Sequence, residues 1–337
     1  MRFIFLIPFS INIDDMSSSI DIKGKLLSYL RSESQNPRIT FAAPPAPLTG
    51  GFDTAIYKFQ LKGASPDLSR PLVLRVFTRD PNLDRAPFES IIQNSLANLG
   101  YPVPYVYSTS TNGDIFGGSF MIMEFMTGQP MVNEPEVQIP RMLAKAHLRL
   151  HSIDTTVIEN KLRKAGISKM DVSFDRRFNW VKEQIENGGH EWLTLALDWI
   201  VEHRPEEPKR LALLHGDFHP LNILVWKGRV SGVLDWSGFM IGDPALDIAI
   251  TRFLGTVAFP YYLVHIDWPR LIGLYSEYYL GERIIDSERI GFYEVVRNLT
   301  SLLEGIEGHR GWGHPDTMVR LSKHFEERTG IRINLPN

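Results

Sequence analysis

Two histidines, an aspartate and an asparagine lie within eight residues of the stretch LLHGDFHPLNILV, between strongly apolar flanks. His215, Asp217 and His219 alternate along the chain, and Asn222 follows three residues later. Burying carboxylate and imidazole groups without partners is costly. The pattern therefore indicates one of two things. Either these side chains satisfy one another in a structural network, or they hold a charged ligand.

A predicted β-hairpin follows this polar cluster. The strand-like runs NILVW and VSGVLD flank Gly228, a typical turn residue. Asn222 and Asp235 should then lie opposite each other at the open end, within roughly 6 Å, and Asp217 should lie near the same end. Carboxylates that close repel each other unless a cation or a partner separates them. Hard oxygen ligands indicate Mg²⁺, which proteins usually bind together with the phosphates of a nucleotide substrate.

Each of these residues also has a purely structural interpretation. Asp217 alone would pass for a loop-closing carboxylate, and Asn222 alone for a turn former. The three oxygen-bearing residues at this spacing together favour catalysis. We expect His215 and His219 to brace the loop through backbone hydrogen bonds rather than to bind metal.

A helix start is predicted just after the hairpin. Asp243 precedes Pro244, which is the pattern of an N-cap followed by proline at the first helical position. We assign Asp243 a mainly structural role, and the same role to Asp247 one turn later.

The elements that must position these residues fall into two parts. Apolar, extended segments at 54–61 and 71–77 predict an antiparallel pair, preceded by a Pro- and Gly-rich breaker at 41–53. Helical spacing predicts a helix that ends at Gly100. Further predicted elements of this part are a short helix at 20–33 and an apolar strand at 119–126. The chain then becomes mostly helical, with predicted helices near 175–187, 190–203, 244–254, 268–280, 286–305 and 315–328.

The amino-acid composition limits which classes of protein and site are possible. The 337 residues, with 43% hydrophobic and 22% charged, indicate a globular chain. A net charge of -3 gives no global attraction to nucleic acid or to an anionic membrane, and we expect neither partner. The absence of cysteine excludes disulfides, thiolate catalysis and cysteine zinc sites.

The chain starts with an apolar run, MRFIFLIPFS, that is too short to span a bilayer. No clear small-residue cleavage site follows it, so a disordered or misassigned leader is favoured over a secretion signal, and Met16 is an alternative start. We divide the chain into this leader (1–20), an N-terminal lobe (21–126) and a C-terminal lobe (127–337), and we expect a cytoplasmic protein.

HGDFHPLN followed after twelve residues by DWSGFMIGDPALD resembles the aminoglycoside phosphotransferase and choline kinase family. The resemblance covers about residues 35 to 250. It implies an α+β, bilobal protein-kinase-like fold, with a small β-rich lobe that binds nucleotide and a larger helical lobe. It also implies that Asp217 positions the acceptor hydroxyl and accepts its proton, while Asn222 and Asp235 hold Mg²⁺ on ATP.

The same resemblance assigns roles in the first lobe. Gly50 and Gly51 stand where the family has its loop over the ATP phosphates. Arg75 occupies the place of the phosphate-binding lysine, and Glu89 is expected to pair with it. MIMEFMTG resembles the hinge, so the backbone of Glu124, Phe125 and Met126 is expected to contact adenine.

The leading hypothesis is thus a kinase that moves the γ-phosphoryl of ATP to the hydroxyl of a small-molecule acceptor. One alternative is a nucleotide-binding module without turnover, and another is a metal-dependent hydrolase built on the HGDFH cluster. A protein kinase is disfavoured because only seven residues separate Asp235 from Asp243. The sequence leaves the acceptor, the nucleotide preference and the oligomeric state open.

Overall fold

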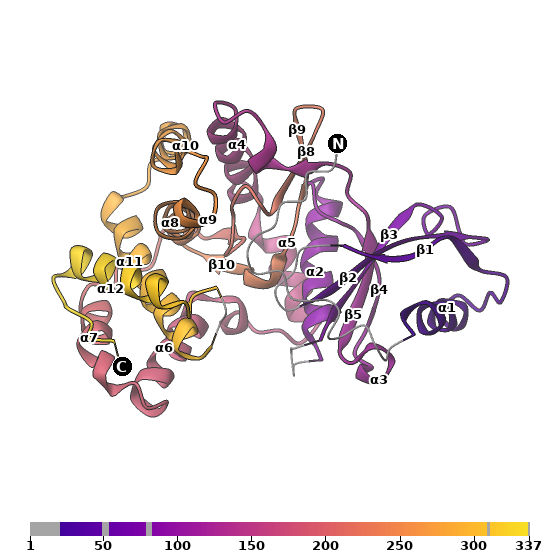
Figure 1. Cartoon of the computed structure of the whole chain (residues 1–337), viewed down its shortest axis with the longest axis horizontal. Coiled ribbons are helices and arrows are strands. Elements are labelled where there is room, and N and C mark those ends of the chain that lie inside the picture. The colour runs from indigo at the N-terminus through magenta and orange to yellow at the C-terminus, as the bar shows by residue number, and fades with distance from the viewer. Residues whose placement is uncertain (1–20, 49–53, 79–82, 309–310, 336–337) are drawn as a thin grey trace. The chain divides into compact units, whose positions relative to one another are not determined.

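The structure, a computed structural model, describes residues 21–48, 54–78, 83–308 and 311–335. The described chain forms two compact units (Figure 1). The first runs to Gly128 and also includes Ser231–Leu234, and the second comprises Gln129–Val230 and the chain from Asp235 onward. The predicted leader, residues 1–20, lies outside the described residues.

The first unit is built on a five-stranded antiparallel sheet of order β1-β2-β3-β5-β4. Its strands are β1 (Thr40–Pro47), β2 (Ala55–Lys62), β3 (Pro71–Phe77), β4 (Val106–Ser110) and β5 (Ser119–Glu124). Its helices are α1 (Ile22–Glu33), α2 (Arg85–Asn98) and the short α3 (Gly113–Phe116). The predicted antiparallel pair of β2 and β3 is confirmed.

The central strand β3 is covered on both faces. Leu72 and Leu74 belong to an apolar cluster with Leu26 of α1, whereas Val73 and Phe77 pack with Ala86 of α2. Side chains alternate across a strand, so Arg75 lies on the same face as Val73 and Phe77. A strand with two covered faces forces any charged residue on it to find a partner.

The first sheet corrects the predicted breaker at 41–53. Residues up to Pro47 extend as the edge strand β1, and its pairing with β2 shifts register twice. Proline lacks an N–H and is tolerated at a sheet edge and at bulges, so this sequence forms a strand despite three prolines. Strand β4 had not been predicted; it completes the opposite edge.

The second unit is mostly helical. Its helices are α4 (Ile139–His151), α5 (Thr155–Lys164), α6 (Phe174–Asn187), α7 (Thr194–Glu202), α8 (Pro244–Phe253), α9 (Phe259–Tyr262), α10 (Trp268–Glu282), α11 (Ser287–Ile306) and α12 (Pro315–Thr329). Helix α4 packs against α10, and α11 packs against α8 and α12. The predicted helices are confirmed, and α5 and the short α9 are two that the spacing had not indicated.

Short strands interrupt this helical unit. They are β6 (Gln129–Pro130), β7 (Ala212–Leu214), β8 (Ile223–Trp226) and β10 (Met240–Gly242), together with β9 (Arg229–Val233), which continues into the first unit from Ser231 onward. The predicted hairpin corresponds to β8 and β9, and Gly228 has the positive φ of +70° that its turn requires.

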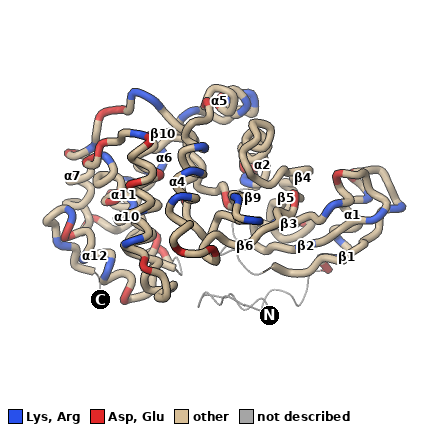
Figure 2. Tube along the Cα trace, turned by 90° about the horizontal axis from the view of Figure 1, so that it is seen from above, with Lys and Arg blue, Asp and Glu red and all other residues tan. Residues whose placement is uncertain are grey.

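Lys and Arg residues are interspersed with Asp and Glu along both units (Figure 2). In the described part of the chain, every helix is too short or too polar to cross a bilayer.

Candidate active site

The polar cluster lies on a loop that two short strands hold in place. Strand β7 ends at Leu214, and β8 begins at Ile223. Strand β7 is fully buried and pairs antiparallel with β10, so that Leu214 lies opposite Met240. The loop that carries Asp217 and the segment after Asp235 are therefore fixed to each other through this pair.

Asp217, His219 and Asn222 converge at the tip of the loop. Asn222 Nδ2 donates hydrogen bonds to the backbone oxygen and to Oδ2 of Asp217, both at 3.0 Å. His219 Nε2 lies 3.2 Å from the same Oδ2 and 3.2 Å from Asn222 Nδ2. No described residue forms a hydrogen bond with Asn222 Oδ1. This amide oxygen is therefore available to a ligand.

The Asp217 carboxylate is held in its ionised form. Burial by itself would raise its pKa, but the charge and the hydrogen bond of His219 outweigh it, with help from His215 and Arg297, and the pKa falls below its ordinary value. The side chain nevertheless retains 39% exposure. An ionised and accessible carboxylate can accept a hydrogen bond from an incoming hydroxyl group.

The predicted roles of the two histidines differ in outcome. His215 Nδ1 accepts a hydrogen bond from the backbone N–H of Asp217 at 3.2 Å, so it braces the loop as predicted. His219 instead contacts the side chains of Asp217 and Asn222, and the prediction of backbone bracing is wrong for it. The reason is that the loop turns His219 toward the carboxylate instead of the strand.

Gly216 permits a close backbone approach within the site. Its φ is +77°, and a Cβ atom there would lie 2.0 Å from the backbone oxygen of Gly238. Only glycine has both the conformational freedom and the small size for this contact. Gly216 and Gly238 therefore allow close backbone contact between the loop before Asp217 and the segment that follows Asp235.

Asp235 itself adopts a left-handed conformation, with φ 62° and ψ 80°. This region is uncommon for a residue with a side chain and costs energy, so surrounding structure must hold it there. It ends the hairpin and precedes a single 3-10 turn, Trp236–Gly238, whose Trp236 is fully buried and contacts the His215 ring.

Asp247 anchors the loop that carries Asp217. Its Oδ2 accepts the backbone N–H of His215 at 2.7 Å, and its Oδ1 accepts that of Gly216 at 2.8 Å. These hydrogen bonds agree with the structural role predicted for Asp247. The carboxylate acts directly on His215 and Gly216, the two residues that precede Asp217. Asp243, the other carboxylate of this segment, caps α8 through the Ala245 N–H as predicted and also accepts from Arg289.

Two histidines of α4 complete the environment of Asp247, and the sequence analysis missed both. Nε2 of His147 lies 2.9 Å and Nε2 of His151 lies 3.2 Å from Asp247 Oδ2. Their Nδ1 atoms each lie 2.7 Å from a hydroxyl of α10, that of Tyr275 and that of Tyr279 respectively. All of these side chains are buried. The i, i+4 spacing of the two histidines on one helix was the available signal.

These contacts control protonation in the buried network. Burial would raise the pKa of Asp247, but His147 and His151 hold it well below its ordinary value. Burial and the neighbouring His147 lower the pKa of His151 to about 4. A neutral histidine can donate from Nε2 to the carboxylate while Nδ1 accepts from a tyrosine. The network is thereby satisfied without a metal, although His147, His151 and Asp247 are close enough to hold one.

Acidification is expected to destabilise the protein through His151. In the unfolded chain its pKa is about 6.5, and in the folded chain it is about 4. Between these values the unfolded state binds a proton that the folded state does not, so stability is full above about pH 6.5 and falls toward pH 4. Urea unfolding between pH 7 and 5 measures this slope. A His151→Gln variant should reduce it, and an unchanged slope in that variant would contradict the assignment.

The predicted ion pair of the first unit is present. Arg75 Nη1 donates to Glu89 Oε2 at 3.1 Å, and Glu89 also receives Arg85 Nε at 3.0 Å. Arg75 is 6% exposed and Glu89 is fully buried, so two guanidinium groups compensate one enclosed carboxylate.

The other residues predicted in the first unit are those of the hinge and the two glycines of the phosphate loop. Glu124 ends β5, where its N–H donates to the Tyr105 oxygen, and the Phe125 N–H donates to the Pro71 oxygen. Met126 follows directly in the chain. Gly50 and Gly51 lie outside the described residues.

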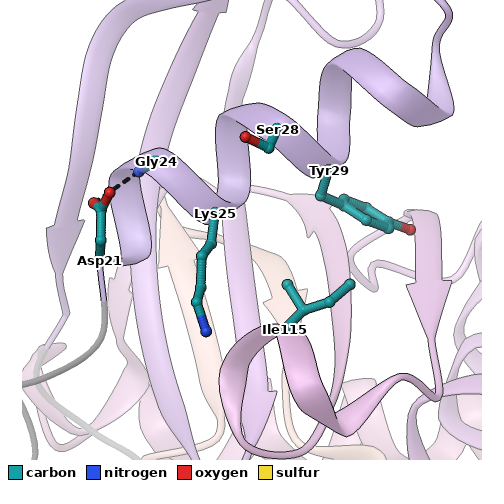
Figure 3. A pocket seen from close by; sticks show the side chains of 6 residues that line it. All are labelled: Asp21, Gly24, Lys25, Ser28, Tyr29 and Ile115. Atoms are coloured by element: carbon teal, nitrogen blue, oxygen red, sulfur yellow. Dashed lines mark hydrogen bonds between the residues drawn. The ribbon is translucent and has the colours of Figure 1, made fainter.

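A pocket of about 480 Å³ lies elsewhere, on α1 and α3 of the first unit (Figure 3). Asp21, Gly24, Lys25, Ser28, Tyr29 and Ile115 line it. There the Asp21 carboxylate accepts the Gly24 N–H and caps α1 (Figure 3). None of these residues belongs to the predicted site, so we assign the pocket no part in it.

Comparison with known proteins identifies the family. Residues 46–293 match the phosphotransferase enzyme family, APH. The chain belongs to this family. The structure also resembles that of aminoglycoside phosphotransferase APH(4)-Ia, with a TM-score of 0.66 and 17% identity over 91% of this chain and 98% of that one. The predicted family and the predicted α+β, protein-kinase-like fold are both confirmed.

Two curated relatives are much longer than this chain. A probable acyl-CoA dehydrogenase, IBR3 of Arabidopsis thaliana, is 30% identical over 175 residues, which are 44% of this chain and 20% of the relative. Acyl-CoA dehydrogenase family member 11 of Pongo abelii is 28% identical over 246 residues, which are 66% of this chain and 29% of the relative. The chain thus spans less than a third of the length of these relatives.

Proposed function

We propose that this chain is a Mg²⁺-dependent phosphotransferase that moves the γ-phosphoryl of ATP to a hydroxyl of a small molecule. The observation that carries the proposal is the contact of Asn222 with Asp217. The Asn222 amide group holds the carboxylate through Nδ2 and leaves Oδ1 for a cation. Membership of the phosphotransferase family supports the same reaction class.

The donor set fits Mg²⁺. An amide oxygen from Asn222 and a carboxylate from Asp235 are the hard oxygen ligands that this ion prefers. When bound, the ion would neutralise negative charge on the phosphates of the nucleotide. The metal-dependent hydrolase receives no comparable support. His215 Nδ1 is already engaged with the backbone, and in the described residues the HGDFH cluster is not among the groups that could hold a metal.

Asp217 would receive the acceptor hydroxyl. Its depressed pKa makes it a weak base, so it acts mainly by orienting the hydroxyl oxygen toward the γ-phosphorus. The proton passes to the carboxylate as the new P–O bond forms and the bond to ADP breaks. His219, hydrogen-bonded to the same carboxylate, keeps it in place.

The first unit would supply the nucleotide contacts. Arg75, held by Glu89, places a guanidinium group for the phosphates, and the fork geometry suits phosphate oxygens. Gly50 and Gly51 would approach the phosphates through backbone N–H groups. The backbone of Glu124, Phe125 and Met126 would contact adenine. These assignments, the lobe boundary at 126 and a cytoplasmic location are parts of the proposal.

The acceptor is a small molecule in this proposal. APH(4)-Ia has been crystallised with ADP and hygromycin B, which shows a nucleotide and a small-molecule acceptor in a protein of similar fold. The dehydrogenase names of the longer relatives describe proteins of which this chain matches a minor part, and we do not assign their activity to it.

Thermal unfolding tests the nucleotide site directly. We expect ATP and Mg²⁺ together to stabilise the protein, by about 2.7 kcal/mol at a hundredfold excess over Kd. Neither alone should match this, and Asp235→Ala should remove the effect. Release of ADP on addition of hydroxyl compounds then separates an enzyme from a binding module without turnover. Stabilisation by Zn²⁺, with none by Mg·ATP, would refute the proposal.

A further inference from the structure

Phe218, the residue directly after Asp217, is also held in place by the core. Its ring is fully buried and stacks on the ring of His147, with 4.1 Å between the ring centres and 19° between the planes. Its backbone oxygen accepts a hydrogen bond from Thr251 Oγ1 at 2.7 Å. Asp217 thus lies between two anchored segments of the loop, and the position of its carboxylate depends on both.

His147 of α4 is connected to both of these segments. Its Nε2 lies 2.9 Å from Oδ2 of Asp247, the carboxylate that accepts the two N–H groups before Asp217. An ionised carboxylate only accepts hydrogen bonds, so Nε2 of His147 carries a proton and is the donor. The other ring nitrogen, Nδ1, lies 2.7 Å from the Tyr275 hydroxyl. Partners at both nitrogens fix the plane of the ring, and Phe218 stacks on this plane.

His151 provides a comparison within the same network. It lies one turn further along α4, and its Nε2 lies 3.2 Å from the same Asp247 oxygen. Its Nδ1 lies 2.7 Å from the Tyr279 hydroxyl. The ring of His151, however, contacts the rings of His147 and Tyr279. The two histidines therefore share one pattern of hydrogen bonds, and of the two it is His147 that also packs against Phe218.

We propose that His147, fixed by Tyr275, is a positioning residue for Asp217. The inference rests on the proposed phosphotransferase function and adds a residue that acts through the loop instead of touching the substrate. His147 holds the loop before Asp217 through Asp247 and the loop after it through Phe218. Misplacement of a reacting group by about 1 Å can lower a rate by about 10²-fold. Loss of the His147 ring therefore lowers kcat, and it changes the KM for Mg·ATP little because most of the proposed nucleotide contacts lie in the first unit.

Hydrogen exchange tests how the loop is held. The backbone N–H groups of residues 213–222 are followed by mass spectrometry in His147→Gln and His151→Gln, and a peptide from α11 reports general destabilisation. Glutamine retains an N–H donor for Asp247 but has no ring. Relative to α11, we expect the 213–222 segment to exchange about tenfold faster in His147→Gln and less than about twofold faster in His151→Gln. Equal acceleration in both variants, or none in His147→Gln, would overturn the proposal.

Turnover separates positioning from a purely structural role. ADP release from Mg·ATP is measured with water as the acceptor, and the Tm of each variant is measured alongside. We expect His147→Gln to lower kcat by at least about tenfold and to change the KM for Mg·ATP by less than about twofold. His151→Gln should lower the Tm but keep kcat within about twofold of the wild type. A parallel loss of kcat and Tm in the two variants would show that both histidines only stabilise the fold, and would refute the proposal.

Tyr275→Phe and Tyr279→Phe form a second matched pair. Each removes one buried hydroxyl of α10 and keeps the ring, so both variants should fold. Tyr275→Phe releases Nδ1 of His147 and should lower kcat about fivefold, the scale of one neutral hydrogen bond. Tyr279→Phe acts on His151 and should leave kcat within about twofold. Equal kcat values in the two variants would refute the proposal. No stabilisation of the wild type by Mg·AMP-PNP would instead refute the proposed function, and the exchange comparison decides the role of His147 independently of it.

Discussion

Replacement of Asp217 by asparagine is expected to lower kcat by about 10³-fold, within the roughly 10²–10⁴-fold range of a positioned acid or base. The amide has the same shape and can still accept hydrogen bonds from Asn222, but it has no negative charge with which to orient the acceptor hydroxyl group or to take its proton. The KM for Mg·ATP and the Tm should therefore stay close to wild-type values. Steady-state ADP release measures kcat and the KM for Mg·ATP, and thermal unfolding measures the Tm.

Asp198→Asn serves as the control for this prediction. Asp198 lies on the exposed face of α7, so the same chemical change there should leave kcat within twofold. A variant at Asp217 that kept more than a tenth of the wild-type kcat would exclude a catalytic role for the carboxylate.

Replacement of Asp247 by alanine is expected to destabilise the protein by about 3–5 kcal/mol, because several buried N–H donors would be left without an acceptor, each at a cost of about 1–3 kcal/mol. The N–H groups of His215 and Gly216, and the two histidines of α4, would lose their common acceptor inside the core. Urea unfolding at pH 7 measures the loss. The less drastic Asp247→Asn should still lower kcat more than tenfold, because its amide N–H₂ cannot accept and displaces the loop.

An exposed capping residue provides the comparison. Asp267 caps α10 by accepting the Arg270 N–H, and Asp267→Ala should cost only about 1 kcal/mol. If the Asp247 variant lost no more than the Asp267 variant, the carboxylate would not be the anchor that its contacts indicate.

Much of the fold followed from local pattern. Apolar, extended segments predicted β2 and β3, and helical spacing with Gly100 as a stop predicted α2. The resemblance to the family implied the Arg75–Glu89 pair, and the structure contains it. Strand β1 was misjudged because proline frequency signals a turn, whereas a sheet edge tolerates residues without an N–H.

The sequence by itself determined the loop chemistry, because Asp217 and Asn222 are only five residues apart and one tight loop brings them into contact. Only the tertiary structure decided what holds and surrounds that loop. His147 and Tyr275 are 128 residues apart, and they meet because α4 packs against α10. Contacts between distant segments are set by the packing of apolar helix faces, and local residue spacing carries no record of them.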